Sequence, residues 1–175
     1  MSTIEKTLYL ARHAKSSWNS GAPNDYQRPL SKRGQHNAEK IGAELAKRGW
    51  KPELVITSPA IRASQTCQVL CKHLGVSKEQ ITWNREVYAA YMVTLLHLLS
   101  KQAETTSSIM LVGHNPSIED LLLHLCGESI WQDYAQQNGK LFTTGNVAKI
   151  TLNDTWQNLA MGNAKLVSLL RPKEC

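Results

Sequence analysis

The sequence lacks any hydrophobic run approaching the roughly 20 residues that a membrane-spanning helix requires. Its four cysteines follow no regular spacing, and low-complexity tracts are absent. Irregularly spaced cysteines indicate reduced thiols, so we expect a cytoplasmic protein without a disulfide framework. Glu5 and Lys6 adjoin only a short apolar segment, so no secretory signal is expected at the start. These absences favour a globular protein that does not contact a membrane.

The sequence also lacks the common cofactor motifs. It has no glycine-rich phosphate-binding loop, no carboxylate cluster of the kind that holds magnesium, and no zinc-type spacing of cysteine and histidine. Cys67 and Cys71 lie one helical turn apart, but no further thiol or histidine signature accompanies them, so core packing is expected. We therefore expect neither a metal nor another cofactor.

Positive charge is concentrated in the first part of the chain. Residues 1–75 hold 12 Lys and Arg against 5 Asp and Glu, whereas residues 76–175 hold 8 against 9. A positive half indicates an anionic partner, which could be nucleic acid, an acidic protein or a phosphorylated small molecule. Aromatic residues are not interleaved with the basic ones, which disfavours a groove for single-stranded nucleic acid.

Apolar strands alternate with amphipathic helices along the chain. Ser31 is a candidate N-cap for a helix that stops at Gly49, and Ser58-Pro59 a candidate start for a second helix that stops at Gly75. This order predicts one domain over residues 1–175, a three-layer α/β/α sandwich with a mostly parallel sheet. We expect strands over 7–12, 53–58, 81–83, 107–114, 146–152 and 164–170, and helices over 32–48, 59–74, 92–102 and 116–126.

Polar side chains follow three of the predicted strands, at the point where each strand ends. Arg12 and His13 follow the first strand, Arg62 comes shortly after the second, and His114 follows the fourth. Each alone is compatible with a solvated loop or a packed histidine. Ligands of such sheets bind outside the carboxyl ends of the strands, so their joint occurrence predicts a site there.

Phosphoryl transfer is the chemistry that fits these residue types. Arginine binds phosphoryl oxygens with two parallel hydrogen bonds, and helix N-termini add oriented N–H donors. A neutral imidazole can act as the in-line nucleophile and carry the phosphoryl group covalently. The arginines would neutralise the charge that a metal ion neutralises elsewhere.

Three ordered motifs resemble the histidine phosphatase superfamily, the phosphoglycerate mutase-like enzymes. They are "LARHAKSSWN", "SPAIRASQT" and "LVGHNP", and the resemblance runs from about residue 6 to 170. More narrowly, "DYQRPLSKRG" and "FTTGNVAKITL" resemble the short SixA-type phosphohistidine phosphatases. The resemblance implies the phosphoglycerate mutase-like fold.

The resemblance also implies roles for individual residues. His13 would be the nucleophile, and Asn19 would be a further phosphate contact. Arg12, Arg62 and His114 would bind the phosphoryl oxygens. Arg28 would line the pocket in the SixA-type branch. Ser16 and Lys15 of the opening motif are further candidate substrate contacts.

The sequence departs from the family pattern at two points. Ala14 stands where the family usually has glycine after the nucleophile, which removes easy access to positive φ. The glutamate acid of the mutase-like members has no clear counterpart, because Glu86 in "REVYAA" lies in a different context. Asp25 in "DYQRPL" is an equally good candidate, so the general acid is left open between these two.

The interval between the acid region and the fourth strand bears on the substrate. Only residues 87–107 lie between them, and one predicted helix fills most of this interval, so no long insertion covers the site. An open site favours a metal-independent phosphatase acting on phosphohistidine of a signalling or phosphocarrier protein. The alternatives are a phosphatase for small molecules or for phosphoserine, phosphothreonine or phosphotyrosine, and, less favoured, a phosphate-recognising or nucleic-acid-binding module without catalysis.

Overall fold

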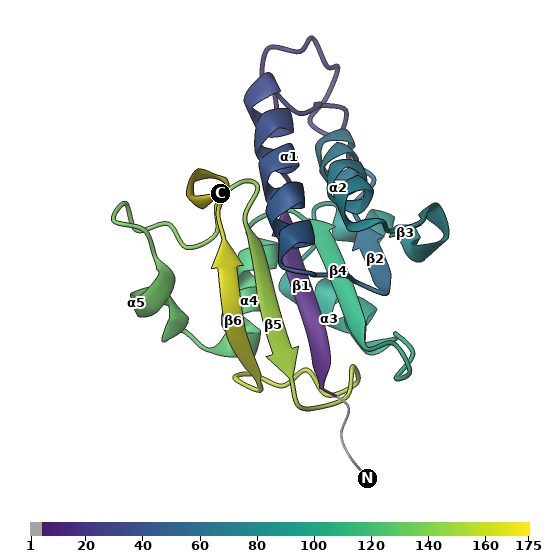
Figure 1. The fold of residues 1–175 in the computed structure, drawn as a ribbon, viewed down its shortest axis with the longest axis vertical. Helices are drawn as coiled ribbons and strands as arrows, with labels where there is room; N and C mark the ends of the chain where they lie inside the picture. The colour runs from purple at the N-terminus through teal and green to yellow at the C-terminus, as the bar shows by residue number, and fades with distance from the viewer. Residues whose placement is uncertain (1–4) are drawn as a thin grey trace.

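The computed structural model describes residues 5–175, which form a six-stranded sheet with helices on both faces (Figure 1). The strands are β1 (Lys6–Arg12), β2 (Leu54–Thr57), β3 (Ile81–Trp83), β4 (Ser108–Gly113), β5 (Val147–Leu152) and β6 (Ala164–Leu170). The helices are α1 (Lys32–Lys47), α2 (Ile61–Leu74), α3 (Met92–Ser100), α4 (Ser117–Cys126) and α5 (Ile130–Tyr134). Single 3-10 turns are η1 (Lys78–Gln80), η2 (Arg85–Val87) and η3 (Pro172–Glu174).

The sheet has the strand order β3-β2-β4-β1-β5-β6. Strands β1 to β4 pair in parallel, whereas β5 is antiparallel to β1 and β6 is antiparallel to β5. All six residues of β4 are buried, as expected of a central parallel strand covered on both faces. The predicted α/β class with a mostly parallel sheet is confirmed. The antiparallel pairings are those of β5 and β6, the two strands at one side of the sheet.

Two hydrophobic layers lie on opposite faces of the sheet, because side chains alternate along a strand. Leu8 and Leu10 of β1 belong to the cluster that contains the buried residues of α3 and α4. Tyr9 and Ala11 belong to the cluster that contains those of α1 and α2. In Figure 1, α1 and α2 lie in front of the sheet and α3 and α4 behind it. Each fully buried leucine stabilises the fold by roughly 1.5–3 kcal/mol. Because helices cover both faces of the sheet, the three-layer prediction is confirmed.

The start of α1 is fixed as the sequence predicts. The Ser31 hydroxyl accepts a hydrogen bond from the Gly34 N–H at 3.0 Å. A Cβ at Gly34 would lie 2.0 Å from the Lys15 carbonyl oxygen, so glycine is required where α1 packs on the segment after β1. Gly49 and Gly75, with φ of +68° and +63°, end α1 and α2.

The predicted start of α2 is wrong in detail. The N-cap is Ala60, and the Ser58 hydroxyl accepts from the Ala60 N–H at 3.2 Å without reaching the helix itself. The Ile61 N–H donates instead to the Tyr26 carbonyl oxygen at 3.0 Å. A loop distant in sequence thus satisfies the donor of the first residue of α2.

The register of the sheet sets the functional strand ends level with one another. Arg12 of β1 pairs with Gly113 of β4, and Thr57 of β2 pairs with Val112. Beyond β1, the His13 N–H donates to the Gly113 carbonyl oxygen at 3.0 Å. The segments that carry the predicted site residues therefore leave the same edge of the sheet.

No apolar period in the sequence predicts the short helix α5, because residues 127–145 are mostly polar. Its Ile130 is buried and packs in the cluster with α3 and α4. None of the helices in the described part of the chain is long and apolar enough to cross a membrane.

Candidate active site

His13 follows β1 and is buried, with 8% of its surface exposed. Its Nδ1 lies 2.7 Å from the Ala14 carbonyl oxygen, which can only accept, so Nδ1 carries the proton of the neutral ring. Nε2 then holds a lone pair, and Arg62 Nε donates to it at 3.3 Å. The ring thus presents an unprotonated nitrogen to an arginine.

The charge state of His13 is set by its surroundings. The pKa of His13 is lowered from 6.5 to about 4, mainly by burial and also by the positive charges of Arg62, Arg12 and Arg28, while the hydrogen bond to the Ala14 carbonyl opposes the shift. The ring is therefore neutral at pH 7, as a nucleophile requires.

Ala14 fits its position without strain. Among residues 5–175 the positive φ of a non-glycine residue occurs at Ala89, so Ala14 does not need the conformation that glycine favours. Its N–H donates to Thr66 Oγ1 at 3.0 Å, and its methyl group is fully buried beside Ala38 and Val69. The methyl group contributes to packing between β1 and the two helices in front of the sheet.

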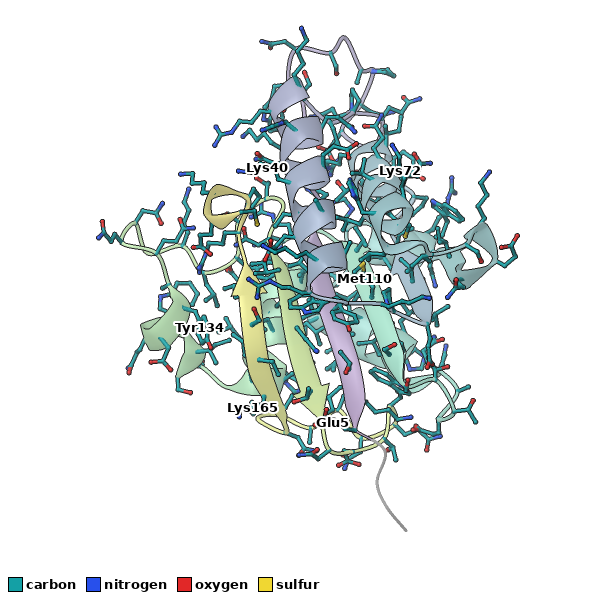
Figure 2. The ribbon with its side chains drawn as sticks, viewed as in Figure 1. Glu5, Lys40, Lys72, Met110, Tyr134 and Lys165 are labelled. Carbon is teal, nitrogen blue, oxygen red and sulfur yellow. The ribbon has the colours of Figure 1, made fainter. Side chains whose placement is uncertain are left out.

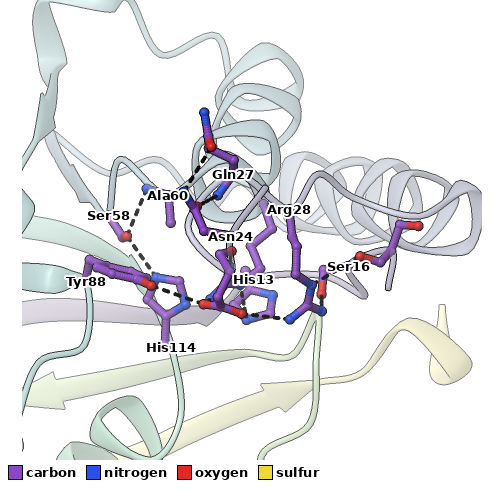
Figure 3. Close-up of polar contacts among 12 residues, drawn as sticks. His13, Ser16, Asn24, Gln27, Arg28, Ser58, Ala60, Tyr88 and His114 are labelled. Atoms are coloured by element: carbon purple, nitrogen blue, oxygen red, sulfur yellow. Dashed lines mark hydrogen bonds and ion pairs between the residues drawn. The ribbon is translucent and has the colours of Figure 1, made fainter. Parts of the chain in front are cut away.

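His114 follows β4 and lies next to His13, with ring centroids 5.0 Å apart (Figure 3). Its Nε2 is 2.8 Å from the Ser58 hydroxyl oxygen, and its Nδ1 is buried without a partner among the described residues. When the Ser58 hydroxyl donates to Nε2, Nδ1 carries the hydrogen and is a donor ready for an incoming oxygen. Burial, and next the charges of His13 and Arg62, lower the His114 pKa to about 3.

Arg12 is anchored at one end of its guanidinium. Its Nη1 donates to the Phe142 carbonyl oxygen at 2.9 Å, while its buried Nε meets no acceptor within residues 5–175. Burial lowers the Arg12 pKa, and the nearby Glu119 carboxylate opposes this shift. A half-buried cation with an unused donor is suited to bind an oxyanion.

Arg62 is held by Asp25 as well as by the nucleophile. Its Nη1 donates to the Asp25 carbonyl oxygen at 2.6 Å, and its Nη2 to Asp25 Oδ2 at 2.9 Å. The other carboxylate oxygen, Oδ1, accepts from Arg28 Nη1 at 2.7 Å. Asp25 therefore lies between the two arginines and orients both.

Asp25 is ionised in this arrangement. Partial burial raises its pKa, but the hydrogen bond and charge of Arg62, together with hydrogen bonds from Tyr88 and Arg28, outweigh this and lower the pKa overall. A general acid needs the opposite shift. The structure brings Asp25 to the site, where it is an ionised partner of Arg62 and Arg28 and not a general acid.

Arg28 and Ser16 also come together at the site, on the opposite side of His13 from Tyr88 (Figure 3). Arg28 Nη2 donates to the Ser16 hydroxyl, and its Nε donates to the Ser17 carbonyl oxygen at 3.1 Å. The Arg28 guanidinium also lies 3.3 Å from the centroid of the exposed Trp18 ring. Arg28 thus ties the loop after β1 to the site.

Three predicted contacts lie outside this group. Glu86 lies in η2, is exposed, and is joined to Asn84 through its backbone N–H at 2.8 Å. Asn19 is exposed at the end of the opening motif. Lys15 is exposed and lines a separate cleft. Their proposed roles stay predictions.

Tyr88 was missed by the sequence reasoning. Its hydroxyl donates to Asp25 Oδ2 at 3.1 Å, and its ring stands edge-on to His114 with centroids 5.6 Å apart. Tyr26 also packs edge-on against the Tyr88 ring, with centroids 4.9 Å apart. The signal available was the aromatic residue two positions after Glu86 in "REVYAA".

Cys67 and Cys71 pack in the core, as predicted, with their Sγ atoms 3.7 Å apart. Groups of three or more His, Cys, Asp or Glu that could hold a metal ion do not occur within residues 5–175.

The neutral His13 ring leads to a testable pH dependence. Because its pKa is lowered to about 4, protonation should remove the nucleophile only near that pH, and the ring should stay neutral between pH 5.5 and 8. Long-range 1H–15N NMR spectra should show the Nδ1–H tautomer throughout that range. A His13 titration with a midpoint near the ordinary 6.5 would contradict the site geometry.

The chain is similar to known proteins in sequence and in fold. The model of the histidine phosphatase superfamily (branch 1) matches residues 8–89. A protein assigned as phosphohistidine phosphatase SixA from Agrobacterium tumefaciens has 30% sequence identity and a TM-score of 0.81, covering 95% of this chain and 98% of its own. A second protein assigned as phosphohistidine phosphatase SixA, from Nakamurella multipartitia, has 27% sequence identity and a TM-score of 0.78, covering 96% of this chain and 96% of its own.

A relative of similar length occurs in Mycobacterium leprae, where it is named only as an uncharacterized protein. It is 29% identical over 165 residues, which cover 93% of this chain and 99% of the relative. The fold is the phosphoglycerate mutase-like α/β fold of the SixA structures, and the family supports phosphatase chemistry. With two neutral histidines and two arginines at one sheet edge, this chain belongs to the histidine phosphatase superfamily, in its SixA-like group.

Proposed function

We propose that this chain is a metal-independent phosphatase that removes the phosphoryl group from phosphohistidine on a protein, through a covalent intermediate on His13. The main support for this proposal is the neutral His13 ring, which lies beside His114 and whose Nε2 accepts a hydrogen bond from Arg62 Nε at 3.3 Å. The similarity to two proteins assigned as phosphohistidine phosphatases supports the substrate.

The reaction takes two displacements at phosphorus. His13 Nε2 attacks the phosphorus, the bond to the substrate nitrogen breaks, and that nitrogen keeps the bonding electron pair as the substrate leaves. A water molecule then attacks the phosphoryl group on His13, giving up a proton, and His13 leaves with inorganic phosphate as product. Arg12, Arg62 and His114 bind the phosphoryl oxygens and offset the charge that develops on them.

The ionised state of Asp25 favours phosphohistidine over alkyl esters. A phosphohistidine whose second ring nitrogen is protonated leaves as neutral imidazole, which needs little help from an acid. An alkyl ester leaves as an alkoxide and needs a general acid, a contribution of roughly 10²–10⁴-fold in rate. Asp25 has a lowered pKa and is ionised between Arg62 and Arg28, so it is a poor acid in this arrangement.

The position of α3 favours a substrate as large as a protein. This helix is the main element between Val87 and β4, and its buried residues pack with α4 behind the sheet (Figure 1). It therefore does not cover the catalytic edge, and a phosphorylated side chain can enter while still attached to its own fold.

A phosphatase for small molecules or phosphotyrosine is the second candidate. A hollow of about 450 Å³, bounded by Asn24, Tyr26, Gln27, Arg85 and Tyr88, adjoins the Asp25 segment. Its two tyrosines could contact the ring of an aromatic phosphoester.

The substrate test compares kcat/KM in EDTA for a phosphohistidine protein, a phosphoserine peptide and a sugar phosphate. We expect the phosphohistidine protein to be preferred by at least roughly 10²-fold. Glu86→Gln should leave phosphohistidine turnover within about twofold of wild type, like the exposed control Glu79→Gln, because phosphohistidine needs no general acid. Asp25→Asn should lower turnover of every substrate, because Arg62 and Arg28 lose their shared partner.

A preference for the sugar phosphate that is lost in Glu86→Gln would refute the phosphohistidine assignment. That outcome would make Glu86 the general acid and promote the small-molecule function.

A further inference from the structure

A second basic site lies beside the catalytic residues. It is a cleft of about 220 Å³ between the start of α1, the segment before β5 and the C-terminal turn η3. Its walls carry five cationic side chains and no carboxylate: Lys15, Arg33, Lys140, Arg171 and Lys173. Such a concentration of one charge in a concave surface attracts anionic groups.

Arg171 supplies an independent sign of a missing partner. Its Nη1 pairs with Glu174 at 3.2 Å, and its Nη2 donates to the Tyr134 carbonyl oxygen. Its Nε is buried and has no partner in the part of the chain that the structure describes. A buried guanidinium donor without an acceptor is costly, and an incoming oxygen would satisfy it.

The cleft is fixed to the nucleophile segment by short contacts. The Gly145 N–H donates to the carbonyl oxygens of Arg12 and His13, at 3.2 and 3.1 Å. Gly145 has a φ of +82°, and a Cβ there would lie 2.9 Å from Pro172 Cγ, so glycine allows η3 to pack here. His13 faces the catalytic pocket and Lys15, two residues on, lines the cleft. The two sites therefore flank one segment.

We propose that this cleft docks an acidic segment of the phosphohistidine protein, so that aspartate or glutamate side chains bind there while the phosphohistidine reaches His13. This inference rests on the proposed function. A volume of about 220 Å³ is smaller than the roughly 300–1,000 Å³ of a typical small-molecule site, which fits a few carboxylates of a larger partner.

The lining also disfavours nucleic acid. The cleft walls carry amide and hydroxyl groups, such as Asn37 and Thr143, but no aromatic side chain. Single-stranded nucleic acids bind through bases stacked on aromatic rings as well as through phosphates. Carboxylates need only the cations and hydrogen-bond donors that are present.

The test uses two phosphohistidine peptides that are identical except for a flanking run of glutamates or of glutamines. Wild type should hydrolyse the glutamate peptide with a KM roughly tenfold lower at low salt, and the advantage should shrink as salt rises. The double variant Arg33→Glu/Lys173→Glu, both exposed positions, should lose this advantage. The turnover of p-nitrophenyl phosphate should stay unchanged.

A matched control carries the same change in charge elsewhere. Lys72 lies in the last turn of α2, and Lys165 at the opposite end of the sheet from the cleft (Figure 2). Lys72→Glu/Lys165→Glu should retain the preference for the glutamate peptide. Equal KM values for the two peptides in wild type, or equal loss of preference in both double variants, would overturn the docking proposal.

Failure of the proposed function would be seen separately. If wild type hydrolyses neither peptide, the phosphohistidine assignment is wrong. The docking proposal is then tested by measuring the Kd of the same two peptides, each with a stable phosphonate analogue in place of its phosphohistidine. A tighter Kd for the glutamate peptide that Arg33→Glu/Lys173→Glu removes supports docking, and equal Kd values overturn it. Competition by poly-uridylate but not by poly-glutamate would also overturn it.

Discussion

Replacing His13 with alanine is expected to lower phosphatase turnover by at least roughly 10⁴-fold, because the variant has no nucleophile to carry the phosphoryl group. His13 lies beyond the end of β1 and outside both hydrophobic layers of the sheet, so the fold should persist. The exposed His36 on α1 provides a matched control, and His36→Ala should keep wild-type turnover.

The intermediate itself can be trapped. Wild-type protein quenched during turnover should carry phosphate on His13 that is released by acid and retained in base, the pattern of a phosphorylated nitrogen. His13→Ala should show none. A His13→Ala variant with circular dichroism like wild type and more than a small fraction of its activity would disprove covalent catalysis by this residue.

Replacing Arg62 with alanine should have the second largest effect. Arg62 is 7% exposed and donates to His13 Nε2, so it lies where the transferred phosphoryl group must pass. Loss of one such donor to a transition-state oxyanion costs about 3–4 kcal/mol, or roughly hundredfold or more in kcat. Arg62→Lys should recover only part of this, because an ammonium cannot form the two parallel hydrogen bonds of a guanidinium.

Lys15→Ala gives the contrast. Lys15 is exposed and lines the basic cleft, away from the contacts that join Arg62, His13 and Asp25. With p-nitrophenyl phosphate, which carries no acidic segment to bind in the cleft, the kcat of Lys15→Ala should stay within about twofold of wild type. Equal losses in Arg62→Ala and Lys15→Ala would mean that the phosphoryl group binds elsewhere.

The order of elements and the position of the site could be read from the sequence. The apolar run of β4, the Ser31 cap and the glycine stops at Gly49 and Gly75 all act within a few residues, and local signals of this kind specify local structure. Parallel strands end at one edge of a sheet, so residues directly after them must converge. That rule alone predicts that His13 and His114 lie together.

The roles of the side chains beyond the strand ends were decided by the tertiary structure. Asp25 and Glu86 were equal candidates in the sequence, and only the fold of the loop places Asp25 between Arg62 and Arg28 and leaves Glu86 exposed. Tyr88 became a neighbour of His114 in the same way.

The same holds for Ser58 and Lys15. Ser58 pairs with His114 because the parallel strands β2 and β4 lie side by side and end next to each other. Lys15 lines the basic cleft because α1 packs on its backbone at Gly34. In each case the direction of a side chain depends on contacts between segments far apart in the chain, and no periodicity or capping rule encodes such contacts.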